Sequence, residues 1–164
     1  TVFIIFSTQA FAEQTIVVLD MKYVLNNSKS GKDAQEFLKK QFNDNTKKLS
    51  EFEKSLKKEE TDLLAAKANL SKEEYKTKSD SLRKKVAKYQ SERRSSLDKL
   101  ASKRNEVRKI IVDKIKPILD TYMKENSISM VIDRESMIVG SKDFDITEVI
   151  IQKLDKEFPS INLQ

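Results

Sequence analysis

The chain has 164 residues, of which 35% are charged and 38% apolar, and its formal net charge at pH 7 is +6. It contains no cysteine and no histidine, which excludes disulfides, thiol and imidazole catalysis, and zinc sites of the usual Cys/His type. It has only two glycines and two prolines, so few tight turns are available and long helices are expected.

Residues 1–12 have the pattern of a signal peptide that is truncated at its front. An apolar run from Val2 to Phe6 precedes Ala10-Phe11-Ala12, whose alanines have the spacing that signal peptidase accepts. We therefore expect export and cleavage after Ala12. An N-terminal strand or a short membrane anchor is the alternative, although the run is far shorter than the roughly 20 residues that cross a bilayer.

A short apolar run, Ile16-Val17-Val18-Leu19, favours a strand that is buried on both faces. Met21 to Leu25 would add one helical turn. The long helical region is then expected to begin at Ser30, whose hydroxyl would cap the free backbone amides of the first turn.

Residues 33–126 contain one proline and no glycine, and apolar residues recur at intervals of seven in the first half of this stretch. Such a narrow stripe is typical of a coiled-coil seam. Its members are Phe42, Leu49, Leu56, Leu63 and Leu70. Ser71 and Glu74 form a capping box, so a second helix should start there and fold back on the first.

The second helix also contains steps of eleven residues, such as Val86 to Leu97, which locally unwind a left-handed supercoil. We therefore expect a helical hairpin over residues 33–107 that is straighter in that stretch. Residues 108–126 extend past the hairpin and are more apolar, so they should pack on a body formed by the chain ends.

The C-terminal part predicts further elements of that body. Ile128 to Asp133 has the composition of a second strand, Ser136 to Val139 that of a third, and Gly140 that of a turn. Asp145 and Glu148 have capping-box spacing and would open a last helix that ends at about Phe158.

The expected fold is therefore mostly α, with a long antiparallel coiled-coil hairpin that protrudes from a small body of short strands. The body would comprise residues 13–32 plus 108–164. Because short strands with exposed edges need neighbours, we expect the body to oligomerise.

Positive charge is concentrated on the second helix. Residues 33–70 carry eight basic and eight acidic side chains, whereas residues 71–109 carry 14 basic and six acidic ones, a net charge of +8. A solvated surface explains any single lysine, but this excess favours attraction of acidic or unfolded anionic partners. The residues expected to bind such a partner are Arg83, Lys84, Lys85, Lys88, Arg93, Arg94, Lys103 and Arg104.

The sequence predicts no enzyme, no metal site and no cofactor. Two S-x-x-K matches, which begin at Ser55 and Ser96, are expected by chance in a helix rich in serine and lysine. Asp133 and Glu135 form a carboxylate pair beside a predicted strand. Without a nearby His, Cys or Gly-rich loop, this pair favours a hydrogen-bonding turn over acid catalysis.

Several segments carry a resemblance to a known family: Ile16-Val17-Val18-Leu19-Asp20 with the following Met21-Lys22-Tyr23-Val24-Leu25, then Met130-Val131-Ile132-Asp133, and Asp145-Ile146-Thr147. With the basic hairpin between them, the chain resembles the OmpH family of periplasmic chaperones. The resemblance implies a homotrimer whose short strands share a β body. Three hairpins would reach out around a cavity that holds unfolded outer-membrane proteins without ATP.

The resemblance also implies a periplasmic location and a set of residues in the trimer body. That set is Ile16, Val17, Val18, Leu19, Met130, Val131 and Ile132. We expect a holdase chaperone that prevents aggregation of outer-membrane proteins before insertion.

The alternative is a structural coiled-coil envelope protein that binds no client. Few aromatic residues and the export pattern argue against nucleic-acid binding through the basic helix. An anionic membrane surface is a further partner that this helix would attract.

Overall fold

The computed structural model describes residues 15–163, so the predicted signal peptide and its cleavage after Ala12 lie outside the described residues. The described chain divides into two compact units. The body unit comprises residues 15–31 and Ile111–Ser160. The arm unit comprises Lys32–Ile110, and residues 161–163 are grouped with it.

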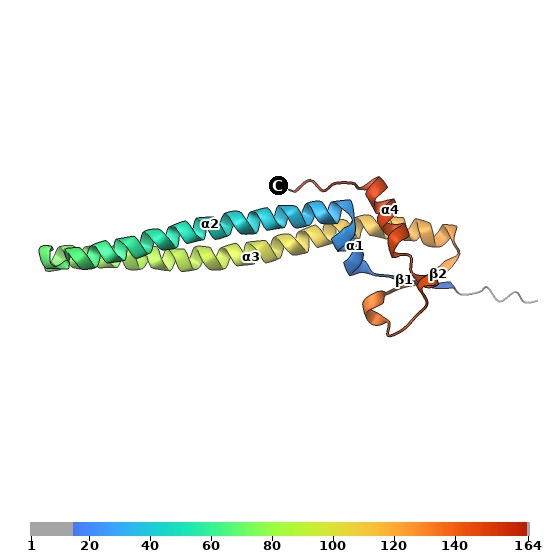
Figure 1. The fold of residues 1–164 in the computed structure, drawn as a ribbon, viewed down its shortest axis with the longest axis horizontal. Helices are drawn as coiled ribbons and strands as arrows, with labels where there is room; N and C mark the ends of the chain where they lie inside the picture. Colours follow the sequence, from blue (N-terminus) through green and yellow to red (C-terminus); the bar gives the residue numbers. More distant parts are fainter. Residues whose placement is uncertain (1–14, 164) are drawn as a thin grey trace, which may run out of the picture. The chain divides into compact units, whose positions relative to one another are not determined.

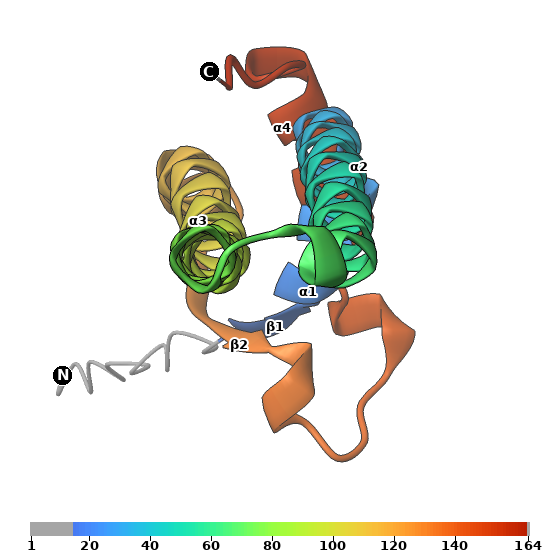
Figure 2. The same cartoon turned by 90° about the vertical axis from the view of Figure 1, so that its left-hand side faces the viewer.

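The arm unit is a hairpin of two long helices. Helix α2 spans Lys29–Ala66, a 3-10 helix at Lys67–Asn69 forms the turn, and helix α3 spans Lys72–Glu125. Within the arm unit the two helices lie side by side and antiparallel (Figures 1 and 2). The predicted reversal near residue 70 is therefore confirmed.

Cross-hairpin contacts show how the two helices pair. The rings of Phe52 and Tyr89 meet edge to face with centroids 5.6 Å apart, and Lys85 Nζ lies 2.7 Å from Glu59 Oε1. Leu56, at the centre of the predicted seam, is only 7% exposed. Most of the heptad stripe is buried or half-buried, but Phe42 is 48% exposed and does not belong to the closed seam.

The capping box that starts α3 is confirmed. Ser71 Oγ accepts a hydrogen bond from the Glu74 backbone N–H at 3.2 Å, and Glu74 Oε2 accepts one from the Ser71 N–H at 2.9 Å. The Ser71 hydroxyl also donates to Glu74 Oε2 at 2.7 Å, and this bond, together with the one from the Ser71 N–H, lowers the pKa of Glu74. The turn therefore satisfies backbone donors that the start of a helix otherwise leaves open.

The expected cap of α2 at Ser30 is wrong. The helix begins at Lys29, and Ser28 Oγ accepts from the Gly31 N–H at 3.1 Å. The Lys29 N–H donates to Asp155 Oδ1 at 2.7 Å, which secures a second amide of the first turn. Ser30 is instead fully buried, and its hydroxyl has no hydrogen-bond partner among the described residues.

The body unit contains the two predicted strands. Strand β1 spans Thr15–Leu19, strand β2 spans Ile128–Asp133, and they pair in parallel, with Ile16 opposite Met130. Helix α1, Met21–Asn27, follows β1 directly. Helix α4, Thr147–Glu157, ends one residue before the predicted Phe158.

Apolar residues from all parts of this unit are buried. Val24 of α1, Ile115 of α3, and Ile150 and Leu154 of α4 are each fully buried. Val17, Val18 and Leu19 of β1 are buried as well. Ile111, Ile115 and Ile118, from the apolar stretch that follows the predicted hairpin, are also buried within this unit.

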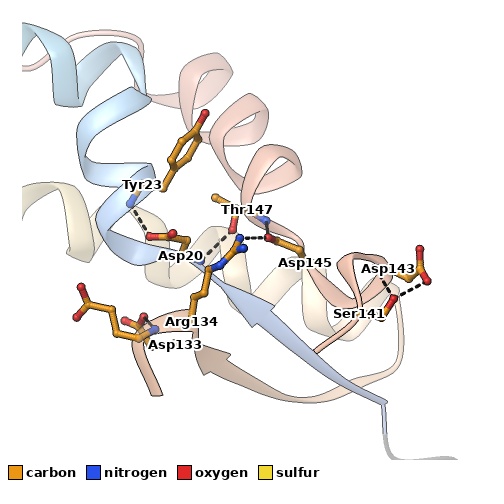
Figure 3. Close-up of polar contacts among 9 residues, drawn as sticks. Asp20, Tyr23, Asp133, Arg134, Ser141, Asp143, Asp145 and Thr147 are labelled. Atoms are coloured by element: carbon orange, nitrogen blue, oxygen red, sulfur yellow. Dashed lines mark hydrogen bonds and ion pairs between the residues drawn. The ribbon is translucent and has the colours of Figure 1, made fainter. Parts of the chain in front are cut away.

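Polar contacts tie the first and last elements of the body unit together (Figure 3). The Asp20 N–H donates to Thr147 Oγ1, and the Thr147 N–H donates to Asp145 Oδ1, both at 2.9 Å. Arg134 Nη1 lies 2.8 Å from Asp145 Oδ2. Burial raises the pKa of Asp145, but the Thr147 hydrogen bonds and the Arg134 charge outweigh it, and the pKa is lowered.

Two details of this region differ from the prediction. The segment from Ser136 to Val139 is not a strand: Ser136 ends a 3-10 helix, Arg134–Ser136, the Met137 N–H donates to the Arg134 carbonyl, and no strand within residues 15–163 pairs with the segment. The edge of β1 opposite β2 is met at Val18 by Asp145 instead. The predicted capping box of Asp145 and Glu148 is wrong: Asp145 accepts from the Thr147 N–H, and Ile146 occupies the N-cap position without a side-chain bond.

Candidate binding groove on the arm unit

The arm unit carries an open groove with a volume of about 1060 Å³ between α2 and α3. Four large apolar side chains remain substantially exposed there: Phe42 at 48%, Leu64 at 59%, Val86 at 41% and Leu97 at 57%. These four are the exposed large apolar residues of the described arm, and all of them line the groove. The arm therefore gathers its exposed apolar surface in one place.

Helical periodicity explains this gathering. Three turns of an α-helix take 10.8 residues, so side chains eleven apart share a face with little drift. Phe42 and Leu64 on α2 are two such steps apart, and Tyr75, Val86 and Leu97 on α3 are successive steps. Residues in these rows stay together on the groove, whose lining also includes Leu49, Leu56 and Leu63 of the seven-residue stripe.

A charged cluster lies along the same groove. Glu53 Oε1 is 2.9 Å from Lys57 Nζ, and the Tyr89 hydroxyl lies within hydrogen-bond distance of Glu53 Oε2, at 3.4 Å. The hydrogen bond and charge of Lys57, helped by Tyr89 and Arg93, lower the pKa of Glu53. Glu53 in turn raises the pKa of Lys57, so both groups are charged at neutral pH.

The predicted basic residues lie on the surface of α3, exposed except for the half-buried Lys103. Half of them are in ion pairs: Arg83 with Asp80 at 3.2 Å, Lys85 with Glu59 at 2.7 Å, Lys88 with Glu92 at 3.8 Å, and Lys103 with Glu106 at 3.1 Å. Lys84, Arg93, Arg94 and Arg104 have no ion pair within 4.0 Å among residues 15–163.

Only two of these eight residues, Arg83 and Arg93, line the groove. The rest lie elsewhere on α3 and are not gathered into one site. Sequence reasoning missed the apolar groove itself. The eleven-residue step from Val86 to Leu97 is the sequence feature that indicates the groove. From the sequence alone, that step predicts only a local change of supercoiling.

The predicted body residues fall into two groups. Val17, Val18 and Leu19 are buried within their own chain, and Val131 and Ile132 are half-buried. Ile16 and Met130, which are neighbours across the sheet, are 43% and 53% exposed. The nearby loop also exposes apolar residues: Ile138 at 103%, Val139 at 86% and Phe144 at 49%.

The carboxylate pair at the end of β2 forms a turn, as the sequence favoured. Asp133 Oδ1 accepts a hydrogen bond from the Glu135 N–H at 3.0 Å. Across residues 15–163, no three acidic side chains come together to hold a metal ion. No helix in the same range is long and apolar enough to cross a membrane.

Comparison with known proteins assigns the family. A curated relative from Aquifex aeolicus (strain VF5), an uncharacterised protein, is 36% identical over 58 residues; the match covers 35% of this chain and 36% of the relative. The crystal structure of a candidate outer membrane chaperone (OmpH-like) from Caulobacter crescentus CB15 has the same fold. Its TM-score is 0.86 at 15% identity, over 99% of this chain and 96% of the other.

The family match is the most extensive of the sequence comparisons. Residues 15–154 match the family described as outer membrane protein (OmpH-like), which takes in all the strands, α1, α2, α3 and most of α4. The resemblance seen in the sequence is thereby confirmed, and the chain belongs to the OmpH-like family.

Proposed function

We propose that this protein is a periplasmic holdase chaperone that binds unfolded outer-membrane proteins on its arms and keeps them from aggregating. The observation that carries the proposal is the groove, where the exposed apolar side chains of the arm lie beside cations of α3. An unfolded membrane protein exposes apolar segments, and such segments would gain free energy by covering these side chains.

The groove suits reversible holding. Fully burying one large apolar side chain contributes about 1.5–3 kcal/mol, and these four are already about half covered. Each contact is therefore weak, and a client would be held by several of them together. Such binding needs no ATP for release, because a competing step such as membrane insertion can remove one segment at a time.

The basic surface of α3 would contribute to the initial capture of a client rather than to holding it. Lys84, Arg94 and Arg104 lie outside the groove and have no acidic partner within 4.0 Å in the described chain. Exposed charges attract an oppositely charged chain over about 8–10 Å at physiological salt and raise its association rate. An anionic membrane surface would be attracted in the same way.

The exposed apolar residues of the body unit support assembly of several copies, and a homotrimer is the state we propose. Ile16 and Met130 form an apolar pair on one face of a two-stranded sheet, and β2 has no second strand partner within residues 15–163. Exposed apolar faces and open strand edges are covered in soluble proteins. Sedimentation velocity at micromolar concentration should show a single species of three chains.

The test of chaperone activity is an aggregation assay. A urea-unfolded β-barrel membrane protein is diluted into buffer with or without stoichiometric protein, and light scattering is followed. We expect scattering to be suppressed, with protection falling as salt rises. Unchanged scattering at every salt concentration would support the alternative, a structural coiled-coil envelope protein without client holding.

A charge variant and its matched control sharpen that assay. Neutralising Lys84, Arg94 and Arg104 to glutamine should weaken capture at low salt without dissociating the oligomer. The control neutralises Lys39, Lys40 and Lys47 on α2, where acidic and basic residues balance, and should change capture less.

A further inference from the structure

The length of the groove limits what it can hold. Phe42 and Leu64, the ends of the row on α2, are 22 residues apart, and at 1.5 Å per residue this is about 33 Å along the helix. An extended chain rises about 3.3 Å per residue, so about ten residues would run the same distance. A helical occupant would need about 22 residues to cover it.

The lining of the groove also sets the chemistry of an occupant. Apolar side chains lie toward both ends, with Leu64 near the turn of the hairpin and Phe42 and Leu97 farthest from it. Arg93 also lines the groove; its charge acts on Glu53, but no acidic group of the described residues lies within 4.0 Å of it. An occupant therefore needs apolar groups along its length and gains from a carboxylate within reach of Arg93.

We infer that the groove seats one extended segment of about ten residues in which large apolar side chains alternate with polar ones, including an acidic residue. This inference rests on the proposed holdase function and names the part of the client that the arm binds. Alternation places every second side chain on one face of an extended chain. That face would lie against the groove while the polar face stays in water.

Membrane-spanning strands of β-barrels fit this description. They have about 9–11 residues and alternate apolar and polar side chains. One arm would thus cover one prospective membrane strand before it pairs with another. Because strands of this type are similar in length and pattern, one groove would serve many clients with little dependence on sequence.

The inference is tested with peptides on the full-length protein. A labelled ten-residue peptide of alternating leucine and threonine with one aspartate is titrated by fluorescence anisotropy. A peptide of the same composition with its leucines in one block is the first comparison. A 22-residue peptide with leucines at helical spacing is the second. We expect the alternating peptide to bind about tenfold more tightly than either.

Length and site are tested separately. Shortening the alternating peptide to five residues should weaken binding about tenfold, whereas doubling it should improve binding by no more than about twofold. Replacing Leu64 and Val86 by serine should weaken binding of the ten-residue peptide about tenfold. The control, Val149→Ser, alters a residue of α4 that is 38% exposed and should bind like the wild type.

Charge complementarity gives a double-mutant cycle. Changing the peptide aspartate to asparagine should weaken binding a few-fold to the wild type but not to Arg93→Gln. Equal losses for both proteins would contradict the role of Arg93.

The outcomes separate the inference from the function it rests on. If the helical or the blocked peptide binds as tightly as the alternating one while the protein still suppresses client aggregation, the inference fails and the holdase function stands. If the client aggregates regardless of the protein, the proposed function itself fails.

Discussion

The body unit and the arm unit bury their apolar residues to different extents. In the body unit, Val24, Ile115, Ile150 and Leu154 are completely buried, as in an ordinary globular core. In the arm unit, Leu56 at the seam is 7% exposed, while side chains such as Leu64 remain about half exposed. The body unit therefore has a closed core beside its exposed sheet and loop residues, whereas the arm unit has no fully buried large apolar side chain among its described residues and leaves several partly exposed along the groove.

The two units also differ in what fixes their conformation. Contacts far apart in sequence hold the body unit, such as Asp20 with Thr147 and Lys29 with Asp155. The arm unit relies on helix-terminal capping and on pairs across the hairpin, such as Phe52 with Tyr89. Substitutions should therefore have large effects on stability in the body unit and small ones in the arm unit.

The largest expected effect is in the body core. Leu154→Ala removes a fully buried side chain and should lower the free energy of unfolding by about 2–5 kcal/mol. Denaturant unfolding followed by circular dichroism, at a fixed protein concentration, measures it. The control Val149→Ala, on the same helix but 38% exposed, should cost less than about 1 kcal/mol. Equal losses would show that α4 does not pack as described.

The next largest effect on stability is expected at Gly31, where two backbone segments lie close together. A Cβ on Gly31 would collide with the backbone carbonyl of Leu25, so Gly31→Ala should destabilise by about 1–3 kcal/mol despite the better helix propensity of alanine. A Cβ on Gly140 would meet the flexible end of the Met137 side chain, which can move aside. Gly140→Ala should therefore leave the thermal midpoint almost unchanged.

A smaller effect is expected at the turn of the arm. Ser71→Ala removes the capping hydroxyl of α3 and should cost about 1 kcal/mol. The pKa of Glu74 is lowered in the folded chain, so its contribution is present above its unfolded pKa and disappears as pH falls through the folded value. Thermal melts of both proteins at pH 7 and pH 3 should show a larger difference at pH 7. A difference independent of pH would contradict the capping role of Glu74.

The smallest effect concerns the ion pair across the hairpin. Lys85 and Glu59 are 2.7 Å apart but 47% and 39% exposed, so Glu59→Gln should cost only about 0.2–1 kcal/mol. High salt should reduce the difference between variant and wild type. A loss as large as that of Leu154→Ala would overturn the view that the arm depends little on any single contact.

Local sequence patterns predicted the elements whose causes are local. The capping box at Ser71 and the hairpin reversal depend on neighbouring residues, and the strands at Ile16 to Leu19 and Ile128 to Asp133 are marked by local apolar runs, although each needs the other as its partner. The cap of α2 could not be predicted in this way, because Asp155, more than a hundred residues away, binds the Lys29 amide and fixes the start of the helix.

Neither the outcome for the expected third strand nor the groove could be predicted from local sequence patterns. Ser136 to Val139 has a strand-like composition, but a strand also needs a backbone partner, which composition does not supply. The groove needs rows from two helices to meet, and a spacing of eleven within one helix does not reveal the row opposite it. Phe42 fits the seven-residue spacing of the seam, but it is 48% exposed and lines the groove.

The most direct test compares two variants of α3 in the client-aggregation assay. One replaces Val86 and Leu97 by serine, and the other replaces Arg94 and Arg104 by glutamine, with helix content checked by circular dichroism. If the groove holds the client, the serine variant should lose about half or more of its protection at every salt concentration. The glutamine variant should only slow capture at low salt. Wild-type protection by the serine variant would contradict the account.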